Sequence, residues 1–380
     1  MKRPKKIQKK KAWSATWGGT KPFLLLAFCL LLLNLPAMAE RVSHDLQAKA
    51  NSPQLVNVIV QYKSHPDNGH VSTAKRHGAL LKQQHDLINA ITVTMPANRV
   101  EELAAADPEI AYISPDRKLS ATSFSDGFVA ANADVVQNYG YNGSGVGVAV
   151  IDSGIGSNAD LRYRVVYAKD FTGSFTTDDQ YGHGTHVAGI IAGNGSQSSC
   201  GSCFRTFMGV APSVKLLNLK VLDATGSGTD SAVINAIQTA INLKNQYNIR
   251  VINLSLGRGV YENYQQDPLD QAVEQAWKAG IFVVVAAGNY GRDNSNNNNG
   301  YGTITAPGND PYVITVGAMR TMGTQTRVDD VIASYSSKGP TMLDHVVKPD
   351  IVAAGNLVTS TLGANSLLDT LYPSTQVLYS

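Results

Sequence analysis

Cysteine is scarce in this sequence of 380 residues, which contains only Cys29, Cys200 and Cys203. The last two stand in the short segment Cys200-Gly201-Ser202-Cys203. A structural zinc site needs four ligands, and no further ligands lie near this segment. Two interpretations remain, a small loop disulfide or a thioredoxin-like redox pair, and the Gly/Ser-rich surroundings disfavour the redox pair.

Acidic residues are absent before Glu40, whereas residues 1–39 carry eight basic ones. The formal charge of the whole chain is +3, but residues 40–380 hold 24 basic and 29 acidic residues and therefore carry a charge of −5. A mildly acidic body gives no reason to expect nucleic acid or an anionic membrane as a partner. The hydrophobic share of the whole chain, 43%, is enough to bury a core.

Long apolar runs are also rare, and only residues 23–33 form one. This run follows the basic start and precedes Ala37-Met38-Ala39, the small-residue pattern that a signal peptidase cleaves. The run is too short to span a bilayer comfortably, so a cleaved leader is favoured over a membrane anchor. We therefore predict a signal peptide over residues 1–39, secretion, and no membrane partner after cleavage. In an oxidising compartment, Cys200 and Cys203 are expected to form a disulfide.

The residues after the leader predict a small unit of mixed structure. Apolar alternation indicates strands, and a helix is expected to end at Asp107-Pro108 because a residue before proline avoids helical angles. The predicted order is strand, helix, strand, helix and strand, over residues 56–62, 72–84, 91–95, 99–106 and 110–113. This order is typical of a compact α+β sandwich.

The remainder of the chain alternates short apolar runs with helical patterns. Buried strands are expected over residues 146–151, 214–222, 251–256, 281–287 and 312–316. Thr229 or Asp230 caps one predicted helix and Pro268 begins another. Strands that are buried on both faces and joined by crossover helices predict an α/β fold with a parallel sheet. Active sites in such sheets lie beyond the carboxyl ends of the strands.

Three polar residues stand at positions where such a site would form. Asp152 directly follows the apolar residues 148–151, His183 opens a helix of small and apolar residues, and Asn289 follows the buried run 281–287. Each residue alone is more often structural, as a turn aspartate, a buried histidine or a capping amide. Together, and in this order, they indicate a catalytic site.

These blocks resemble the subtilase family, the subtilisin-like serine proteases, over roughly residues 125–362. The segments Asp152-Ser153-Gly154 and His183-Gly184-Thr185-His186 match two of its triad signatures, and the order Asp then His is that of this family. The resemblance implies that Asp152 orients His183, that His183 is the general base, and that Asn289 donates to the oxyanion. It further implies a substrate-binding strand and a pocket for the residue before the cut, formed by Ser255, Leu256 and Gly257 and by Ala286, Ala287 and Gly288.

The resemblance also gives the front unit a meaning, because it is similar to the inhibitory propeptide of that family. The domains are then a signal peptide at 1–39, a propeptide at 40–122 and a peptidase domain at 123–380. Cleavage is expected within the polar stretch of residues 118–125. The expected partners are polypeptide substrates and, as an intramolecular inhibitor, the chain's own propeptide.

One element of the family pattern is missing. The nucleophile of subtilases stands in a Gly-Thr-Ser-Met-Ala block, which this sequence lacks, although the preceding landmark is present as Lys348-Pro349-Asp350-Ile351-Val352-Ala353-Ala354-Gly355. Ser366 and Ser374 have the wrong neighbours for a nucleophile. The simplest interpretation is an incomplete peptidase domain whose serine lies beyond Ser380, so that the chain by itself is inactive. The alternative is a non-catalytic, peptide-binding or inhibitor-like protein that retains a protease fold.

No cofactor or metal is predicted. Asp178-Asp179 and the run 294–299 offer oxygen ligands for calcium, but they lack the spaced pattern of a defined calcium loop, so we interpret them as polar surface loops. His186 follows His183 at i+3 without the intervening glutamate of zinc helices, and we interpret it as structural. Thr305 near the base of the expected pocket has no assigned role.

Overall fold

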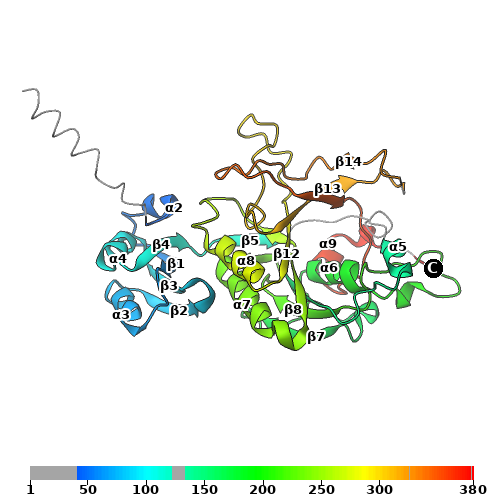
Figure 1. The fold of residues 1–380 in the computed structure, drawn as a ribbon, viewed down its shortest axis with the longest axis horizontal. Helices are drawn as coiled ribbons and strands as arrows, with labels where there is room; N and C mark the ends of the chain where they lie inside the picture. Colours follow the sequence, from blue (N-terminus) through cyan, green and yellow to red (C-terminus); the bar gives the residue numbers. More distant parts are fainter. Residues whose placement is uncertain (1–40, 122–132, 325, 378) are drawn as a thin grey trace, which may run out of the picture. The chain divides into compact units, whose positions relative to one another are not determined.

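Three sheets organise the protein, whose structure is a computed structural model that describes residues 41–121, 133–324, 326–377 and 379–380. The predicted signal peptide and the second half of the predicted cleavage stretch, residues 122–125, lie outside these residues. Residues 41–380 belong to one unit. In Figure 1 the blue and cyan segment carries a sheet of its own, and a larger sheet runs through the green, yellow and orange segments.

The large sheet has eight strands in the described part of the chain. Its path runs β14-β13-β12-β10-β6-β8-β7, with β15 also paired to β13. All pairs are parallel except β13 with β14. The bounds are β6 Gly147–Asp152, β7 Val165–Asp170, β8 Lys215–Lys220, β10 Ile249–Leu254, β12 Phe282–Ala286, β13 Ile314–Arg320, β14 Val331–Ile332 and β15 Ile351–Ala354. The predicted parallel α/β sheet is thus confirmed.

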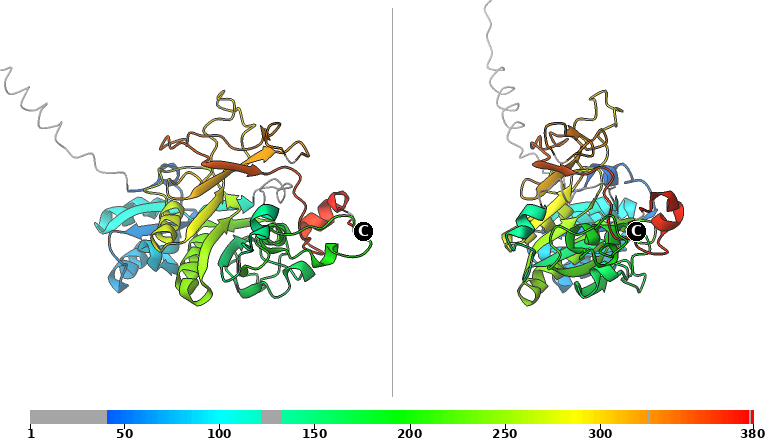
Figure 2. Two further views of the ribbon diagram at one scale, coloured as in Figure 1. Left: turned by 45° about the vertical axis from the view of Figure 1, so that its right-hand side comes forward. Right: turned by 90° about the vertical axis from the view of Figure 1, so that its right-hand side faces the viewer.

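Helices cover both faces of this sheet (Figures 1 and 2). Alternate residues of β6 point to opposite faces: Ala149 and Ile151 pack in the cluster of α7 (Asp230–Tyr247) and α8 (Pro268–Lys278), while Val148 and Val150 pack in that of α6 (His183–Ala192). The predicted helix starts are confirmed, because Thr229 is the N-cap of α7 and Pro268 is the first residue of α8. The other helices after residue 132 are short: α5 Ala133–Asn138, α9 Leu367–Leu371 and 3₁₀ turns at Ala159–Leu161, Ser196–Ser198 and Pro373–Thr375.

Residues 41–121, which we call the front unit, form a four-stranded antiparallel sheet in the order β2-β3-β1-β4. Its elements are α2 His44–Gln47, β1 Leu55–Tyr62, α3 Asn68–Arg76, β2 Leu80–His85, β3 Ala90–Pro96, α4 Val100–Ala106 and β4 Ile110–Pro115, with 3₁₀ turns at Asp86–Ile88 and Ala97–Arg99. The predicted helix over residues 72–84 is therefore wrong in its second half. Gly78, at φ +83°, follows the helix, and the next residues pair with β3 as β2.

The third sheet joins the front unit to the rest of the chain. Its central strand β5 (Lys118–Ala121) pairs antiparallel with β9 (Ser227–Thr229) on one side and β11 (Leu256–Gly257) on the other. We call the space between β9 and β11 the strand slot. The last strand of the front unit thus occupies a slot that two segments of the main domain, residues 133–380, provide.

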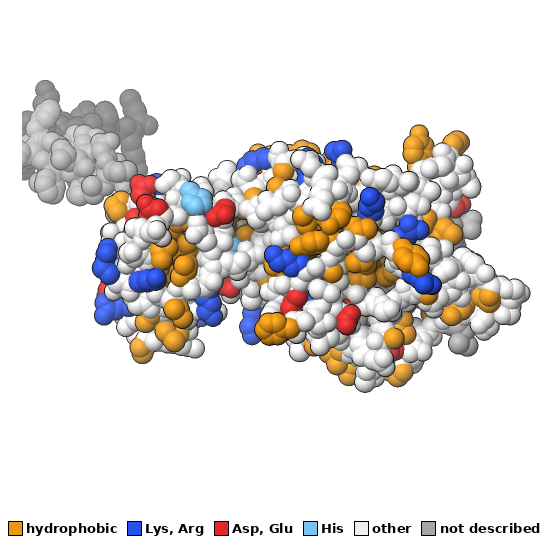
Figure 3. All heavy atoms as spheres, turned by 90° about the horizontal axis from the view of Figure 1, so that it is seen from below, with side chains coloured by type: hydrophobic (Ala, Val, Ile, Leu, Met, Phe, Trp, Pro, Cys, Tyr) orange, Lys and Arg blue, Asp and Glu red, His pale blue; other side chains and the backbone are white. Residues whose placement is uncertain are grey.

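The surface carries both basic and acidic side chains (Figure 3), as the charge composition predicts. On the face that Figure 3 shows, basic and acidic side chains are interspersed. Within the described residues, no helix combines the length and apolarity needed to cross a membrane.

Candidate active site

The predicted site residues come from the carboxyl ends of neighbouring parallel strands. Asp152 is the last residue of β6, Ser255 follows β10, and Ala287 follows β12. Strand β10 lies between β6 and β12, so these ends form one edge of the sheet. The structure therefore brings the predicted residues to the edge where α/β folds place ligands.

Asp152 and His183 form a buried pair. His183 Nδ1 lies 2.6 Å from Asp152 Oδ1, and each residue is only 1% exposed. Asp152 Oδ1 also accepts the Ser153 N–H at 2.7 Å. Because a carboxylate only accepts, the imidazole donates through Nδ1, which fixes the tautomer that leaves Nε2 as the basic nitrogen.

Asp179 anchors the start of α6, so the interpretation of Asp178-Asp179 as a polar surface loop is wrong for Asp179, which is only 5% exposed. Its Oδ2 accepts the N–H and the Oγ1–H of Thr185, both at 2.7 Å. Its Oδ1 accepts the Gly182 N–H at 2.7 Å and the Ser153 Oγ–H at 2.8 Å. These bonds tie the first turn of α6, which carries His183, to the turn after β6. The only sequence signal was an acidic residue shortly before the helix.

Gly184 allows the helix to approach the turn after β6. A Cβ on this residue would lie 2.2 Å from the Gly154 carbonyl oxygen and 3.2 Å from Asp152 Oδ1. The same turn is fixed from beneath by Lys220, a fully buried lysine whose Nζ donates to the carbonyl oxygens of Ser153 and Asp178 at 2.6 and 3.0 Å. Burial lowers the pKa of this ammonium.

The second group of predicted residues lies in and around β11, which borders the strand slot, and at the end of β12. Leu256 and Gly257 form β11 itself, and Ser255 accepts the Asn253 Nδ2–H at 2.9 Å. Ala286 ends β12 and is followed by Ala287, Gly288 and the half-buried Asn289. Gly288 adopts φ +108°, a conformation that favours glycine.

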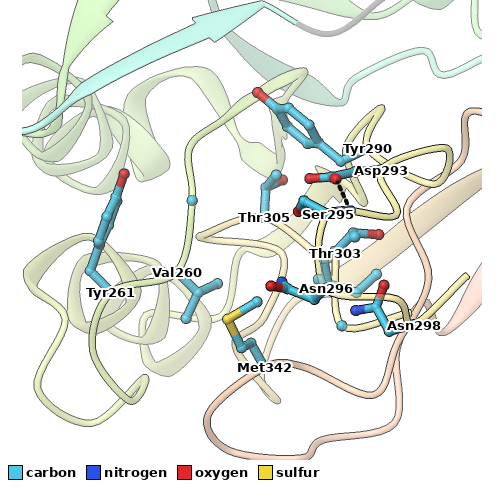
Figure 4. Close-up of a pocket in the computed structure, with 13 residues that line it drawn as sticks. Val260, Tyr261, Tyr290, Asp293, Ser295, Asn296, Asn298, Thr303, Thr305 and Met342 are labelled. Carbon is cyan, nitrogen blue, oxygen red and sulfur yellow. Dashed lines mark hydrogen bonds between the residues drawn. The ribbon is translucent and has the colours of Figure 1, made fainter. Parts of the chain in front are cut away.

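Thr305 lies between these two segments. A Cβ on Gly257 would approach Thr305 Oγ1 to 2.6 Å, and one on Gly288 would approach Thr305 Cγ2 to 2.8 Å. The threonine also lines a cavity of about 350 Å³ beside the slot (Figure 4). The lining includes Tyr261, Tyr290 and Asp293, whose carboxylate accepts the Ser295 N–H at 2.9 Å. The cavity therefore offers aromatic walls and one acidic group.

The other sequence expectations concern cysteine, histidine and metals. Cys200 and Cys203 are joined by a disulfide with their Cα atoms 4.9 Å apart. His186 donates through Nε2 to the Val358 carbonyl oxygen at 3.0 Å, and burial lowers its pKa to about 4, so the ring is neutral. In the described part of the chain, no group of three or more His, Cys, Asp or Glu residues is arranged to hold a metal ion.

Comparison with known proteins defines the class to which this fold and site belong. The model of the Subtilase family matches residues 143–379, well over half of the chain. The chain therefore belongs to the subtilase family of serine proteases.

Two proteins of similar sequence agree with this assignment. The chain is 36% identical over 314 residues to serine protease AprX of Bacillus subtilis (strain 168), covering 80% of this chain and 67% of that protein. It is 35% identical over 353 residues to subtilisin E of the same strain, covering 90% of this chain and 82% of the relative. A solved structure of sphericase is similar at 33% identity and a TM-score of 0.49, over 59% of this chain and 71% of that one.

Proposed function

We propose that this chain is the precursor of a secreted serine endopeptidase that hydrolyses peptide bonds with an Asp-His-Ser triad. Asp152 holds His183 in the Nδ1–H tautomer, and His183 takes the proton of the nucleophile and returns it to the leaving amine. Asn289 donates to the developing oxyanion. We assign the nucleophilic role to no serine of this sequence, because none stands in a Gly-Thr-Ser-Met-Ala block.

The observation that carries this proposal is the 2.6 Å hydrogen bond between His183 Nδ1 and Asp152 Oδ1 at the carboxyl edge of the sheet. The strand slot supports it independently, because an extended chain is bound there through main-chain hydrogen bonds on both sides. This mode of recognition suits a polypeptide substrate of varied sequence.

The front unit is proposed to be an inhibitory propeptide, with domains at 1–39, 40–122 and 123–380. Its last strand, β5, fills the slot that a substrate would use. Further contacts hold it on the main domain, such as the bond from Gln61 Nε2 to the Gln266 carbonyl oxygen at 3.0 Å. Cleavage within residues 118–125 would create a free end in the slot, and the signal peptide would direct the chain out of the cell.

Two measurements test these proposals. The full reading frame that includes this sequence is expressed, and casein hydrolysis is compared between wild type and His183→Ala, with His44→Ala as an exposed control. Wild type and the control are expected to hydrolyse casein. In His183→Ala the rate is expected to fall on the order of 10⁴-fold or more. Undiminished hydrolysis in His183→Ala would refute the assigned base.

The second measurement is the N-terminal sequence of the secreted protein. A start within residues 119–126 is expected if the front unit is removed by cleavage in the polar stretch. A start upstream of Ala111 would refute the propeptide boundary. A reading frame that stops at Ser380, together with peptide binding without hydrolysis, would instead support a binding protein built on this fold.

A further inference from the structure

Arg117 immediately precedes β5 and is buried on the main domain. Its Nη1 donates to Glu262 Oε2 at 2.8 Å and its Nη2 to Glu262 Oε1 at 2.5 Å. Arg117 and Glu262 are 7% and 5% exposed. The guanidinium carbon lies 4.8 Å from the centre of the Tyr261 ring. A two-pronged carboxylate contact beside an aromatic face suits a planar guanidinium far better than an ammonium.

The charges around this contact favour a cation. Arg258, the neighbouring base, is itself bound by Asp230 and Asp267. Glu262 adds a third carboxylate, so the main-domain side of the contact has three carboxylates and only one of these basic side chains, that of Arg258. Asp45 also accepts from Arg117 Nη2, at 3.1 and 3.2 Å, but it belongs to the front unit. Removal of the front unit would take away Arg117 and Asp45 and leave Glu262 and Tyr261 in place.

The main chain of Arg117 is aligned with the strand slot. The Asp230 N–H donates to the Arg117 carbonyl oxygen at 3.1 Å, directly beyond the pairing of Lys118 with Thr229. An extended substrate bound in the slot in the register of β5 would follow the same path. Its residue at the position of Arg117 would place a long side chain over Glu262.

We propose that Glu262 and Tyr261 form a guanidinium subsite that binds an arginine side chain of the polypeptide substrate. This arginine stands two residues before the residue that takes the place of Leu119, and Arg117 occupies the subsite in the precursor. The proposal rests on the proposed peptidase function and specifies its substrate. It gives the enzyme a preference for arginine on the amino side of the cut.

The site itself is tested in the full chain, independently of catalysis. Thermal unfolding is followed for wild type, Arg117→Ala and the double variant Arg117→Ala/Glu262→Gln, each with millimolar ethylguanidinium or ethylammonium. Among the three proteins, only Arg117→Ala is expected to unfold at a higher temperature with ethylguanidinium. Ethylammonium is expected to raise the midpoint of Arg117→Ala less. The same response in all three proteins would overturn the guanidinium site.

The use of the site by substrate is tested with two quenched fluorescent peptides in the processed enzyme. One has the sequence of residues 115–125 and the other carries the change Arg117→Gln. Wild type is expected to cleave the arginine peptide about tenfold more efficiently in kcat/KM, and Glu262→Gln to remove the difference. If Glu262→Gln prefers the arginine peptide as strongly as wild type does, the subsite is overturned.

The two tests separate the two proposals. If neither enzyme cleaves either peptide, the peptidase function fails, whereas the unfolding experiment still decides whether a guanidinium site exists. Should Arg117→Ala not fold, Arg117→Lys replaces it. Ethylguanidinium is then expected to stabilise Arg117→Lys more than wild type, and an equal effect on both proteins would overturn the guanidinium site.

Discussion

The Asp179 carboxylate lies at the N-terminus of α6, where its Oδ2 accepts both the N–H and the Oγ1–H of Thr185 at 2.7 Å. In Asp179→Asn, an amide N–H₂ group can take the place of a carboxylate oxygen and would then face N–H and O–H groups that are themselves donors. We expect Asp179→Asn to lower the free energy of unfolding by about 2–3 kcal/mol, because charge-assisted bonds are lost in a buried place. Urea unfolding measures this change. The exposed neighbour variant Asp178→Asn should change stability little, and an equal effect of both variants would contradict the anchoring role.

Gly184 permits a close backbone approach that no larger residue allows. Gly184→Ala would place a methyl group 2.2 Å from the Gly154 carbonyl oxygen, so the helix must move away from Asp152. We expect a loss of about 1–3 kcal/mol in stability and a drop in kcat of the processed enzyme. Gly201→Ala is the matched control, because nothing lies within 4 Å of its added Cβ. Full activity of Gly184→Ala would show that the Asp152–His183 distance does not depend on this approach.

The buried His85 and the half-buried His186 make stability depend on pH. Burial lowers the pKa of His85 and of His186 from 6.5 to about 4. Between these pH values the unfolded chain binds more protons than the folded chain, so stability is lost as the pH falls from about 6.5 towards 4. Each ring contributes up to about 3 kcal/mol to this loss. Urea unfolding at pH 7 and pH 4 should show a smaller loss for His186→Gln than for wild type, whereas the exposed variant His44→Gln should match wild type.

Arg258 holds two buried carboxylates together. Its Nε donates to Asp230 at 2.9 and 3.0 Å, and its Nη2 to Asp267 at 2.7 and 2.8 Å. Arg258→Met leaves both carboxylates uncompensated, and we expect a loss of about 3–5 kcal/mol at pH 8. Burial raises the pKa of Asp230, so protonation at lower pH should shrink the deficit. Thermal unfolding at pH 8 and pH 5.5 checks this, with Arg99→Met on the surface as the control.

Local signals explain why much of the fold was predictable from the sequence. Thr229 and Pro268 mark the starts of α7 and α8 because capping needs only neighbouring residues. The sequence pattern predicts helix over β2, whereas the structure pairs β2 with β3, a contact that the local pattern does not contain. Strand β5 escaped prediction for the same reason, since its partners β9 and β11 lie far away in the sequence.

In the candidate site, too, features with a local sequence signal were predictable, whereas contacts between distant segments were not. Asp152 ends β6, His183 begins α6 and Asn289 follows the end of β12 by three residues, positions that a sequence pattern makes visible. The anchoring by Asp179 and Lys220 was not visible, because their partners come from other segments and are chosen by side-chain geometry. The contact of Arg117 with Glu262 likewise joins two segments that no local pattern connects.

The position of β5 has a consequence for handling the processed protein. With β5 gone, β9 and β11 would each lose the strand that pairs with them and become sheet edges. Such edges accept any extended segment, including a loop of a second molecule. If the front unit is removed as proposed, the concentrated main domain is therefore expected to self-associate unless a peptide fills the gap.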